Sequence, residues 1–84
     1  MKKIEIIPYD TNKGIELFWE PDSKINVKSD NEVLISANKQ GLISLASHLL
    51  SLAQDEITTG THIHLDEFNS LEDGSCDLVI EKIE

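Results

Sequence analysis

The chain has 84 residues, 39% of them hydrophobic, and carries seven Lys, sixteen Asp and Glu and no Arg, for a net charge of -9. This length and composition predict one folded domain over residues 1–84 and exclude a disordered chain or a second core. The lack of Arg and the excess of carboxylates argue against binding to nucleic acid or to an anionic membrane, because phosphate groups select basic surfaces. A basic protein is the natural electrostatic complement.

The negative charge is concentrated in the second half of the chain. Residues 1–42 hold six Lys and seven acidic residues, whereas residues 43–84 hold nine acidic residues and one Lys, Lys82. Cys76 is the only cysteine, so one chain can form neither an internal disulfide nor a Cys-based zinc site. The N-terminus lacks the apolar core of a signal peptide, and no apolar run reaches membrane-spanning length. We therefore expect a cytoplasmic protein.

The first part of the chain predicts strands. Lys3–Tyr9 and Ile15–Glu20 flank a turn at residues 10–14 and predict a hairpin. Lys24–Lys28 alternates only weakly, and the sequence leaves open whether this stretch is a short edge strand or a loop. Glu32–Ala37, which contains three consecutive large apolar residues, predicts a further strand.

The clearest pattern predicts a helix over roughly residues 39–55, with Ser36 or Asn38 as its N-cap. Apolar residues at helical spacing predict the buried stripe: Leu42, Leu45, Ala46, Leu49, Leu52 and Ala53. The opposite side is predicted to face solvent: Ser44, Ser47, His48, Ser51 and Asp55.

Two more strands are expected after the helix. Thr61–Asp66 alternates strictly, with Ile63 and Leu65 on one side. Cys76–Ile83 forms the last strand, after a loop that contains the turn dipeptide Asp73-Gly74. The two apolar residues of that loop are expected to anchor it: Phe68 and Leu71.

These patterns predict an α+β fold, with a mostly antiparallel sheet of about four to six strands and one amphipathic helix packed on one face. Several predicted strands carry apolar residues on both sides. Because one helix covers only one face, the other face is expected to be partly apolar and to favour a homodimer or a partner.

Two histidines raise the alternative of a metal site. Strand alternation places His62 and His64 on one side with Asp66, and imidazole and carboxylate are ligands of catalytic zinc and non-haem iron. A complete site needs a further fixed ligand, and His48 is predicted to point away from the sheet. We therefore favour exposed strand histidines with no bound metal. A small metal-binding protein or metal-dependent enzyme that uses His62, His64 and Asp66 remains an alternative function, and a homodimeric accessory protein is another.

No other pattern indicates catalysis or a cofactor. Cys76 has no nearby cation in the sequence to lower its pKa and is expected to be a small core residue. The four glycines are isolated, so they do not form a phosphate-binding loop. The chain is therefore predicted to be a binding protein and not an enzyme.

Two features favour binding to a basic protein. Five carboxylates lie within residues 66–77, and a basic partner would relieve their mutual repulsion. An acidic loop kept for solubility explains the same pattern equally well. Trp19 lies beside Glu20, and a Trp with flanking acids is a frequent interface anchor. The predicted partner-binding residues are Trp19, Glu20, His62, His64, Asp66, Glu67, Glu72, Asp73 and Asp77.

Three segments of the chain also carry a family resemblance. Residues 36–42, 45–54 and 60–66 read SANKQGL, LASHLLSLAQ and GTHIHLD. They resemble a family of small bacterial immunity proteins, the one numbered thirty-two among those that accompany polymorphic toxins. The resemblance implies a cytoplasmic protein that binds and neutralises a toxin domain, often a nuclease. It agrees with the charge, because a nuclease presents a cationic cleft that an acidic protein can occlude.

Overall fold

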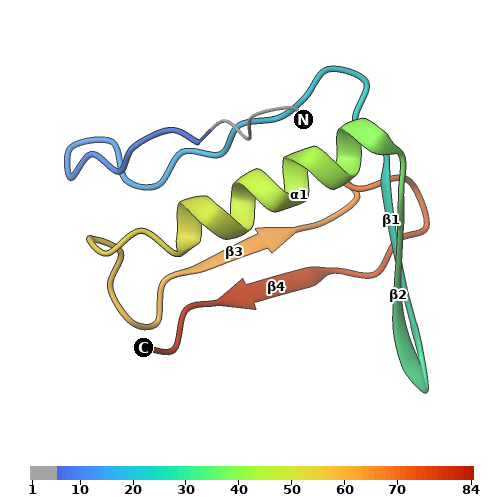
Figure 1. Cartoon of the computed structure of the whole chain (residues 1–84). Coiled ribbons are helices and arrows are strands. Elements are labelled where there is room, and N and C mark those ends of the chain that lie inside the picture. Colours follow the sequence, from blue (N-terminus) through green and yellow to red (C-terminus); the bar gives the residue numbers. More distant parts are fainter. Residues whose placement is uncertain (1–5) are drawn as a thin grey trace.

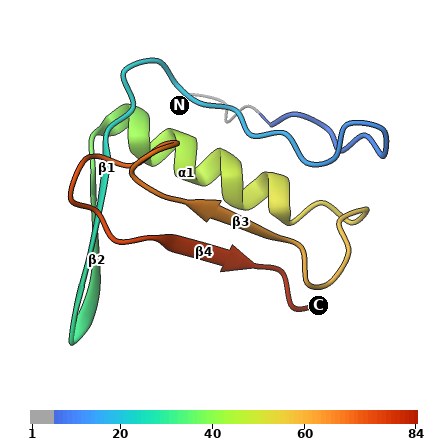
Figure 2. The ribbon, with the colours of Figure 1, turned by 180° about the vertical axis from the view of Figure 1, so that it is seen from behind.

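The computed structural model describes residues 6–84, which contain one helix and two small antiparallel sheets (Figure 1). Along the chain the order is β1 (Ile25–Asp30), β2 (Glu32–Ala37), α1 (Lys39–Leu52), β3 (His62–Leu65) and β4 (Leu78–Glu81). The β1–β2 hairpin projects from the N-terminal end of α1, whereas β3 and β4 run alongside the helix (Figures 1 and 2). Residues 6–20, here called the N-terminal segment, lie along the opposite side of α1.

The α+β class is confirmed, but the single sheet of four to six strands is wrong. β1 pairs with β2, placing Val27 opposite Ile35, and β3 pairs with β4, placing Ile63 opposite Ile80. These pairs form two separate two-stranded sheets. The stretch at Lys24–Lys28, which the sequence left open, belongs to β1.

The predicted N-terminal hairpin is also wrong where it can be examined. Residues 6–9 and 15–20 contain no strand, and Lys3–Glu5 lie outside the described residues. Only the turn between them forms, closed by an isolated bridge between Asp10 and Gly14. Backbone groups that a hairpin would use bond to side chains of α1 and of the residues just after it: the Glu20 amide donates to Ser44 Oγ and the Tyr9 amide to Gln54 Oε1, both at 2.9 Å. The segment therefore docks on the helix and does not pair with itself.

The helix begins as predicted and ends three residues earlier. The Asn38 side chain caps it by accepting a hydrogen bond from the Gly41 amide at 2.8 Å. The turn that follows the helix is held by Lys82, whose Nζ donates to the carbonyls of Gln54 and Ile57 at 2.8 and 2.9 Å. The one Lys of the acidic half is therefore used inside the fold.

The predicted orientation of the helix is wrong for most of its residues. The buried residues of α1 are Gly41, Ser44, Ser47, His48, Ser51 and Leu52, of which only Leu52 belongs to the stripe predicted to be buried. Two leucines of that stripe are about half exposed, Leu42 at 56% and Leu49 at 50%, and the neighbouring Leu50 is 49% exposed. Ser44 can lie inside because its hydroxyl finds two partners: Ser44 Oγ donates to the Gln40 carbonyl and accepts from the Glu20 amide, both at 2.9 Å.

A small apolar cluster joins β1, β3 and the loop between β3 and β4. Its fully buried members are Ile25, Val27, Leu65 and Leu71, and its partly buried neighbours are Trp19, Ala37, Leu45, Cys76 and Leu78. The predictions that Leu71 anchors its loop and that Cys76 packs against the core are confirmed. On the surface, Val33, Leu34, Ile35 and Val79 remain exposed.

Candidate functional site

The acidic loop, defined as Asp66–Asp77, leaves β3 and docks on β1. The Glu72 amide donates to the Ile25 carbonyl at 2.8 Å, and the Cys76 amide donates to the Val27 carbonyl at 2.9 Å. Ser75 Oγ accepts from the Val27 amide at 3.1 Å. The β1 edge thus holds the second half of the loop in place.

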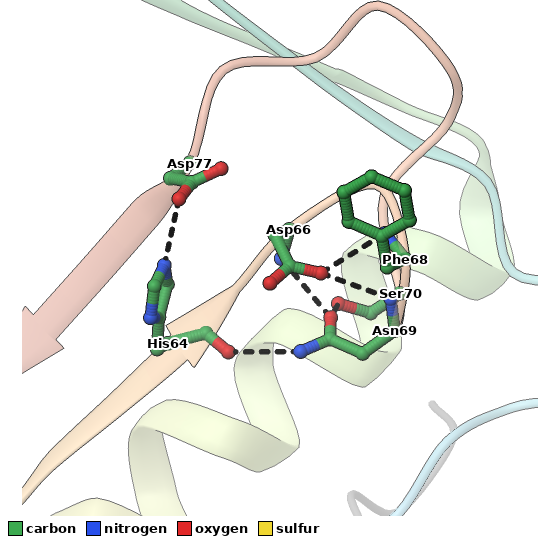
Figure 3. A network of polar contacts seen from close by, with 6 residues as sticks. All are labelled: His64, Asp66, Phe68, Asn69, Ser70 and Asp77. Atoms are coloured by element: carbon green, nitrogen blue, oxygen red, sulfur yellow. Dashed lines mark hydrogen bonds and ion pairs between the residues drawn. The ribbon is translucent and has the colours of Figure 1, made fainter.

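Asp66 fixes the first half of the loop. Its Oδ1 accepts from the amides of Phe68 and Asn69 at 2.9 and 3.0 Å (Figure 3). Asn69 also bonds to Asp66, because its Oδ1 accepts a hydrogen bond from the Asp66 amide at 3.0 Å. The same oxygen accepts a hydrogen bond from the Ser70 hydroxyl. Asn69 Nδ2 donates to the His64 carbonyl at 3.2 Å, which ties the turn to β3. The Asp66 carboxylate is therefore engaged in holding the turn.

Phe68 stands on this turn with 91% of its surface exposed (Figure 3). The prediction that it anchors the loop in the core is wrong. Because Asp66 holds the amide of residue 68, the turn directs the Phe68 side chain outward, and Leu71, at 5% exposure, fills the core instead. Among the exposed large hydrophobic side chains of the described residues, Phe68 has the highest exposed fraction, and it stands on a loop that hydrogen bonds hold in place.

The other carboxylates of the acidic loop differ in how they are engaged. Glu67 Oε2 accepts from the Gly74 amide at 2.9 Å, and Asp77 Oδ2 lies 2.9 Å from His64 Nε2. Glu72 and Asp73 are exposed, and their carboxylates have no hydrogen bond or ion pair within residues 6–84. These two are the carboxylates most available to a partner.

His62 and His64 lie on the exposed face of β3, as the strand alternation predicted. His64 contacts Asp77 and not Asp66, and His62 Nδ1 lies 3.4 Å from the Gly60 carbonyl. No group of three His, Cys, Asp or Glu side chains within residues 6–84 is arranged to hold a metal ion. No observation in the described residues therefore favours the metal alternative.

His48 does not lie on a solvent-facing side of the helix, contrary to prediction. It is fully buried against the N-terminal segment, where its Nε2 lies 3.1 Å from the Phe18 carbonyl. Burial lowers the pKa of His48, while the hydrogen bond to the Phe18 carbonyl acts in the opposite direction. His48 is therefore a structural histidine that stays neutral near pH 7.

The structure gathers most of the predicted partner-binding residues but separates two of them. His62, His64 and the acidic residues lie on β3 and the acidic loop. Trp19 and Glu20 belong to the N-terminal segment on the opposite side of α1 (Figure 1). Trp19 is partly buried against the apolar cluster, and the Glu20 amide donates to Ser44 Oγ.

The residue that sequence reasoning missed as a surface feature is Phe68. One signal was available: Phe68 stands in a loop of polar and acidic residues, and the only other large apolar residue of that loop, Leu71, is three positions away. Two apolar residues at that separation in a short loop need not both reach the core, and here only Leu71 does.

Comparison with protein families identifies the class of protein. The family model described as Immunity protein 32 matches residues 32–83, which covers β2, α1, β3, the acidic loop and β4. The chain belongs to this immunity protein family, and membership indicates a toxin-neutralising role with a cognate toxin as partner. Immunity proteins of this kind generally act by binding and not by catalysis. Comparison with curated proteins and with solved structures gave no match.

One further property of the described residues concerns membranes. Within residues 6–84, no helix combines the length and the apolar character needed to cross a bilayer.

Proposed function

We propose that this chain is a non-enzymatic inhibitor that binds a basic toxin domain through the acidic loop, with Phe68 at the centre of the contact. The observation that carries the proposal is the 91% exposure of Phe68 on a loop fixed by hydrogen bonds at both ends. Large aromatic side chains surrounded by polar groups are the usual centres of binding energy at protein interfaces.

The fixed shape of the acidic loop supports this role. Binding loses less conformational entropy when the contact residues are already ordered. Asp66 holds the Phe68 amide, Glu67 holds the Gly74 amide, and Glu72 is tied to β1 through its own amide. The loop therefore presents Phe68 with little reorganisation on binding.

The free carboxylates supply the electrostatic part of the mechanism. Glu72 and Asp73 directly precede Gly74 in the turn and would steer a cationic surface towards Phe68. His62 and His64, on the adjoining face of β3, would extend the contact together with Asp77, the acidic-loop residue that lies against His64. A nuclease toxin fits this surface, since the loop would occlude the cationic cleft that binds its substrate. The inhibitor would act in the cytoplasm, where a protein with one thiol needs no disulfide.

Trp19 and Glu20 stand apart from this surface. Trp19 supports the apolar cluster from the N-terminal segment, and its partial burial leaves only part of the ring for a partner. We retain both residues as a second predicted contact region. Variants there are expected to weaken binding less than variants of the acidic loop.

A charge-matched pair of variants tests the electrostatic part. Glu72→Gln with Asp73→Asn removes two charges from the acidic loop, and Asp30→Asn with Glu32→Gln removes two from the exposed turn of the β1–β2 hairpin. Affinity for the cognate toxin domain is measured by calorimetry at several salt concentrations. We expect the loop pair to lower both affinity and its salt dependence, and the hairpin pair to resemble wild type. Equal behaviour of the two pairs, or binding insensitive to salt, contradicts the electrostatic role.

A further inference from the structure

The outer face of α1 is apolar although it lies on the surface. We define the outer stripe as Leu42, Ala46, Leu49, Leu50 and Ala53. The three leucines are each about half exposed, while the serine and histidine side of the same helix is buried. The members recur at intervals of three and four residues, the spacing with which one helix packs along another.

The charges around the outer stripe are arranged asymmetrically. No Lys, Asp or Glu occurs between Lys39 and Asp55, so the stripe itself is uncharged. Lys39, in the first turn of α1, is exposed, and Asp55 and Glu56, just beyond its last turn, are exposed too. Within residues 6–84 none of these three side chains has a hydrogen bond or ion pair. A cation at one end and two anions at the other make this surface complementary to itself in the antiparallel sense.

We propose that the outer stripe docks a second copy of this chain, with the two α1 helices packed antiparallel around Ala46. In this arrangement Leu42 of one copy lies beside Leu50 of the other. Lys39 of one copy reaches the end where Asp55 and Glu56 of the other lie. Ala46, a small residue at the crossing point, lets the helices approach closely. The pairing is isologous, as two-fold symmetric dimers require.

The second copy fits this surface better than a basic toxin does. A basic surface would meet Lys39 at one end of the stripe and no carboxylate before Asp55. In the two-fold pairing, Lys39 of each copy lies near Asp55 and Glu56 of the other, so the charges at both ends of the stripe are paired. Each copy carries a net charge of -9, so long-range repulsion opposes association, and added salt screens it. The dimer is therefore expected to strengthen with salt, whereas the proposed toxin contact weakens with salt.

Sedimentation equilibrium of the full chain tests the proposal. One 14-residue helix pair buries less than a standard interface, so the measurement covers about 10 μM to about 1 mM protein. We expect a monomer–dimer equilibrium whose dimer fraction rises between about 50 mM and about 500 mM NaCl. Leu49→Gln is expected to raise the dimer dissociation constant at least about tenfold, because both copies lose the contact. Val79→Gln, at an exposed apolar site on β4, is the matched control and should leave the constant unchanged.

A charge exchange separates specific pairing from general repulsion. Asp55→Lys with Glu56→Lys makes each copy less negative, so repulsion alone would tighten the dimer. In the proposed pairing the two new lysines face Lys39 of the other copy, so these changes should weaken the dimer instead. Adding Lys39→Glu should restore the dimer. Phe68→Ala should leave the dimer unchanged, which separates this proposal from toxin binding.

Cross-linking tests the symmetry even if a helix variant folds poorly. In a Cys76→Ser background, Ala46→Cys places one thiol near the two-fold axis, and mild oxidation should link two copies. Val79→Cys is the control and should link slowly. A chain that stays monomeric at about 1 mM in high salt overturns the proposal. So does a dimer that Leu49→Gln leaves unchanged, or an Ala46→Cys variant that links no faster than Val79→Cys.

Discussion

The rings of Trp19 and His48 meet edge to face, with centroids 4.1 Å apart and planes at 69°. Trp19 comes from the N-terminal segment and His48 from the middle of α1. Together with the contact between His48 Nε2 and the Phe18 carbonyl, this packing holds the N-terminal segment on the polar side of the helix. The leucines of the other side are left to the surface, where the outer stripe forms.

Burial of His48 predicts a pH-dependent stability. Because burial lowers the folded-state pKa below the ordinary value of 6.5, the unfolded chain gains a proton at a higher pH than the folded chain does. The stability that depends on neutral His48 is fully present above about pH 6.5. It is lost as the pH falls below that value, and the free energy of unfolding falls by at most about 1.4 kcal/mol per pH unit. Urea unfolding at about pH 7.5 and about pH 5.5 should show this loss.

The matched variant is His48→Gln, whose amide can still donate to the Phe18 carbonyl but does not titrate in this range. It should be less stable than wild type at neutral pH, because the edge-to-face contact with Trp19 is gone. Its free energy of unfolding should also change less between the two pH values. An identical pH dependence in both proteins would show that His48 is not the titrating group.

Gly41 should resist substitution despite its position in a helix. An Ala Cβ at this site would lie 2.5 Å from the Lys24 carbonyl oxygen and 2.9 Å from a side-chain carbon of Ile25. Gly→Ala in a free helix gains up to about 1 kcal/mol, but the clash with backbone should reverse the sign. We expect Gly41→Ala to lower the free energy of unfolding by about 1–3 kcal/mol in urea titrations. A gain in stability would mean that α1 can move away from β1.

The Asn38 side chain should contribute more to the free energy of unfolding than an ordinary helix cap does. Its Oδ1 accepts from the amides of Gly41 and Lys24 at 2.8 and 3.0 Å, and its Nδ2 donates to the Asp22 carbonyl at 2.9 Å. Asn38→Ala should lower the free energy of unfolding by about 1–2 kcal/mol. Asn38→Asp retains the acceptor and should lose less. Equal losses in thermal or urea unfolding would indicate that the cap is not the main contribution.

Truncation to Ala should lower the stability of the fold strongly at Leu71 and very little at Phe68. Leu71→Ala opens a cavity in the apolar cluster and should lower the free energy of unfolding by about 2–5 kcal/mol. Phe68→Ala removes a side chain that water already surrounds and should change it by less than about 0.5 kcal/mol. A large loss of stability on Phe68→Ala would show that its ring packs on the fold in solution.

Local patterns predicted the parts of the fold that depend on local interactions. The alternation at Ile63 and Leu65 predicted which face of β3 is buried, and Asn38 marked the start of α1. Both signals arise within a few residues of the chain. The turn at Asp73-Gly74 also forms, with the Ser75 amide donating to the Glu72 carbonyl.

The parts that failed depend on tertiary contacts. Helical periodicity marks an apolar stripe but does not say that Ser44 and His48 will find partners in the N-terminal segment. The N-terminal segment bonds to those side chains and does not form a hairpin. The strands that were expected there are therefore absent from the described residues. For the candidate site, the acidic cluster was visible in the sequence, whereas the exposure of Phe68 followed from the turn that Asp66 holds.

The most direct test of the central claim is the affinity of the cognate toxin domain for the Phe68→Ala variant, measured by calorimetry beside wild type and Val33→Ala, on the β1–β2 hairpin. Both substitutions remove an exposed apolar side chain, and neither should unfold the chain. If the acidic loop binds the toxin with Phe68 at its centre, Phe68→Ala should weaken binding by about 2 kcal/mol or more, roughly thirtyfold, and Val33→Ala should remain close to wild type. Binding of Phe68→Ala at wild-type affinity would contradict this account of the interface.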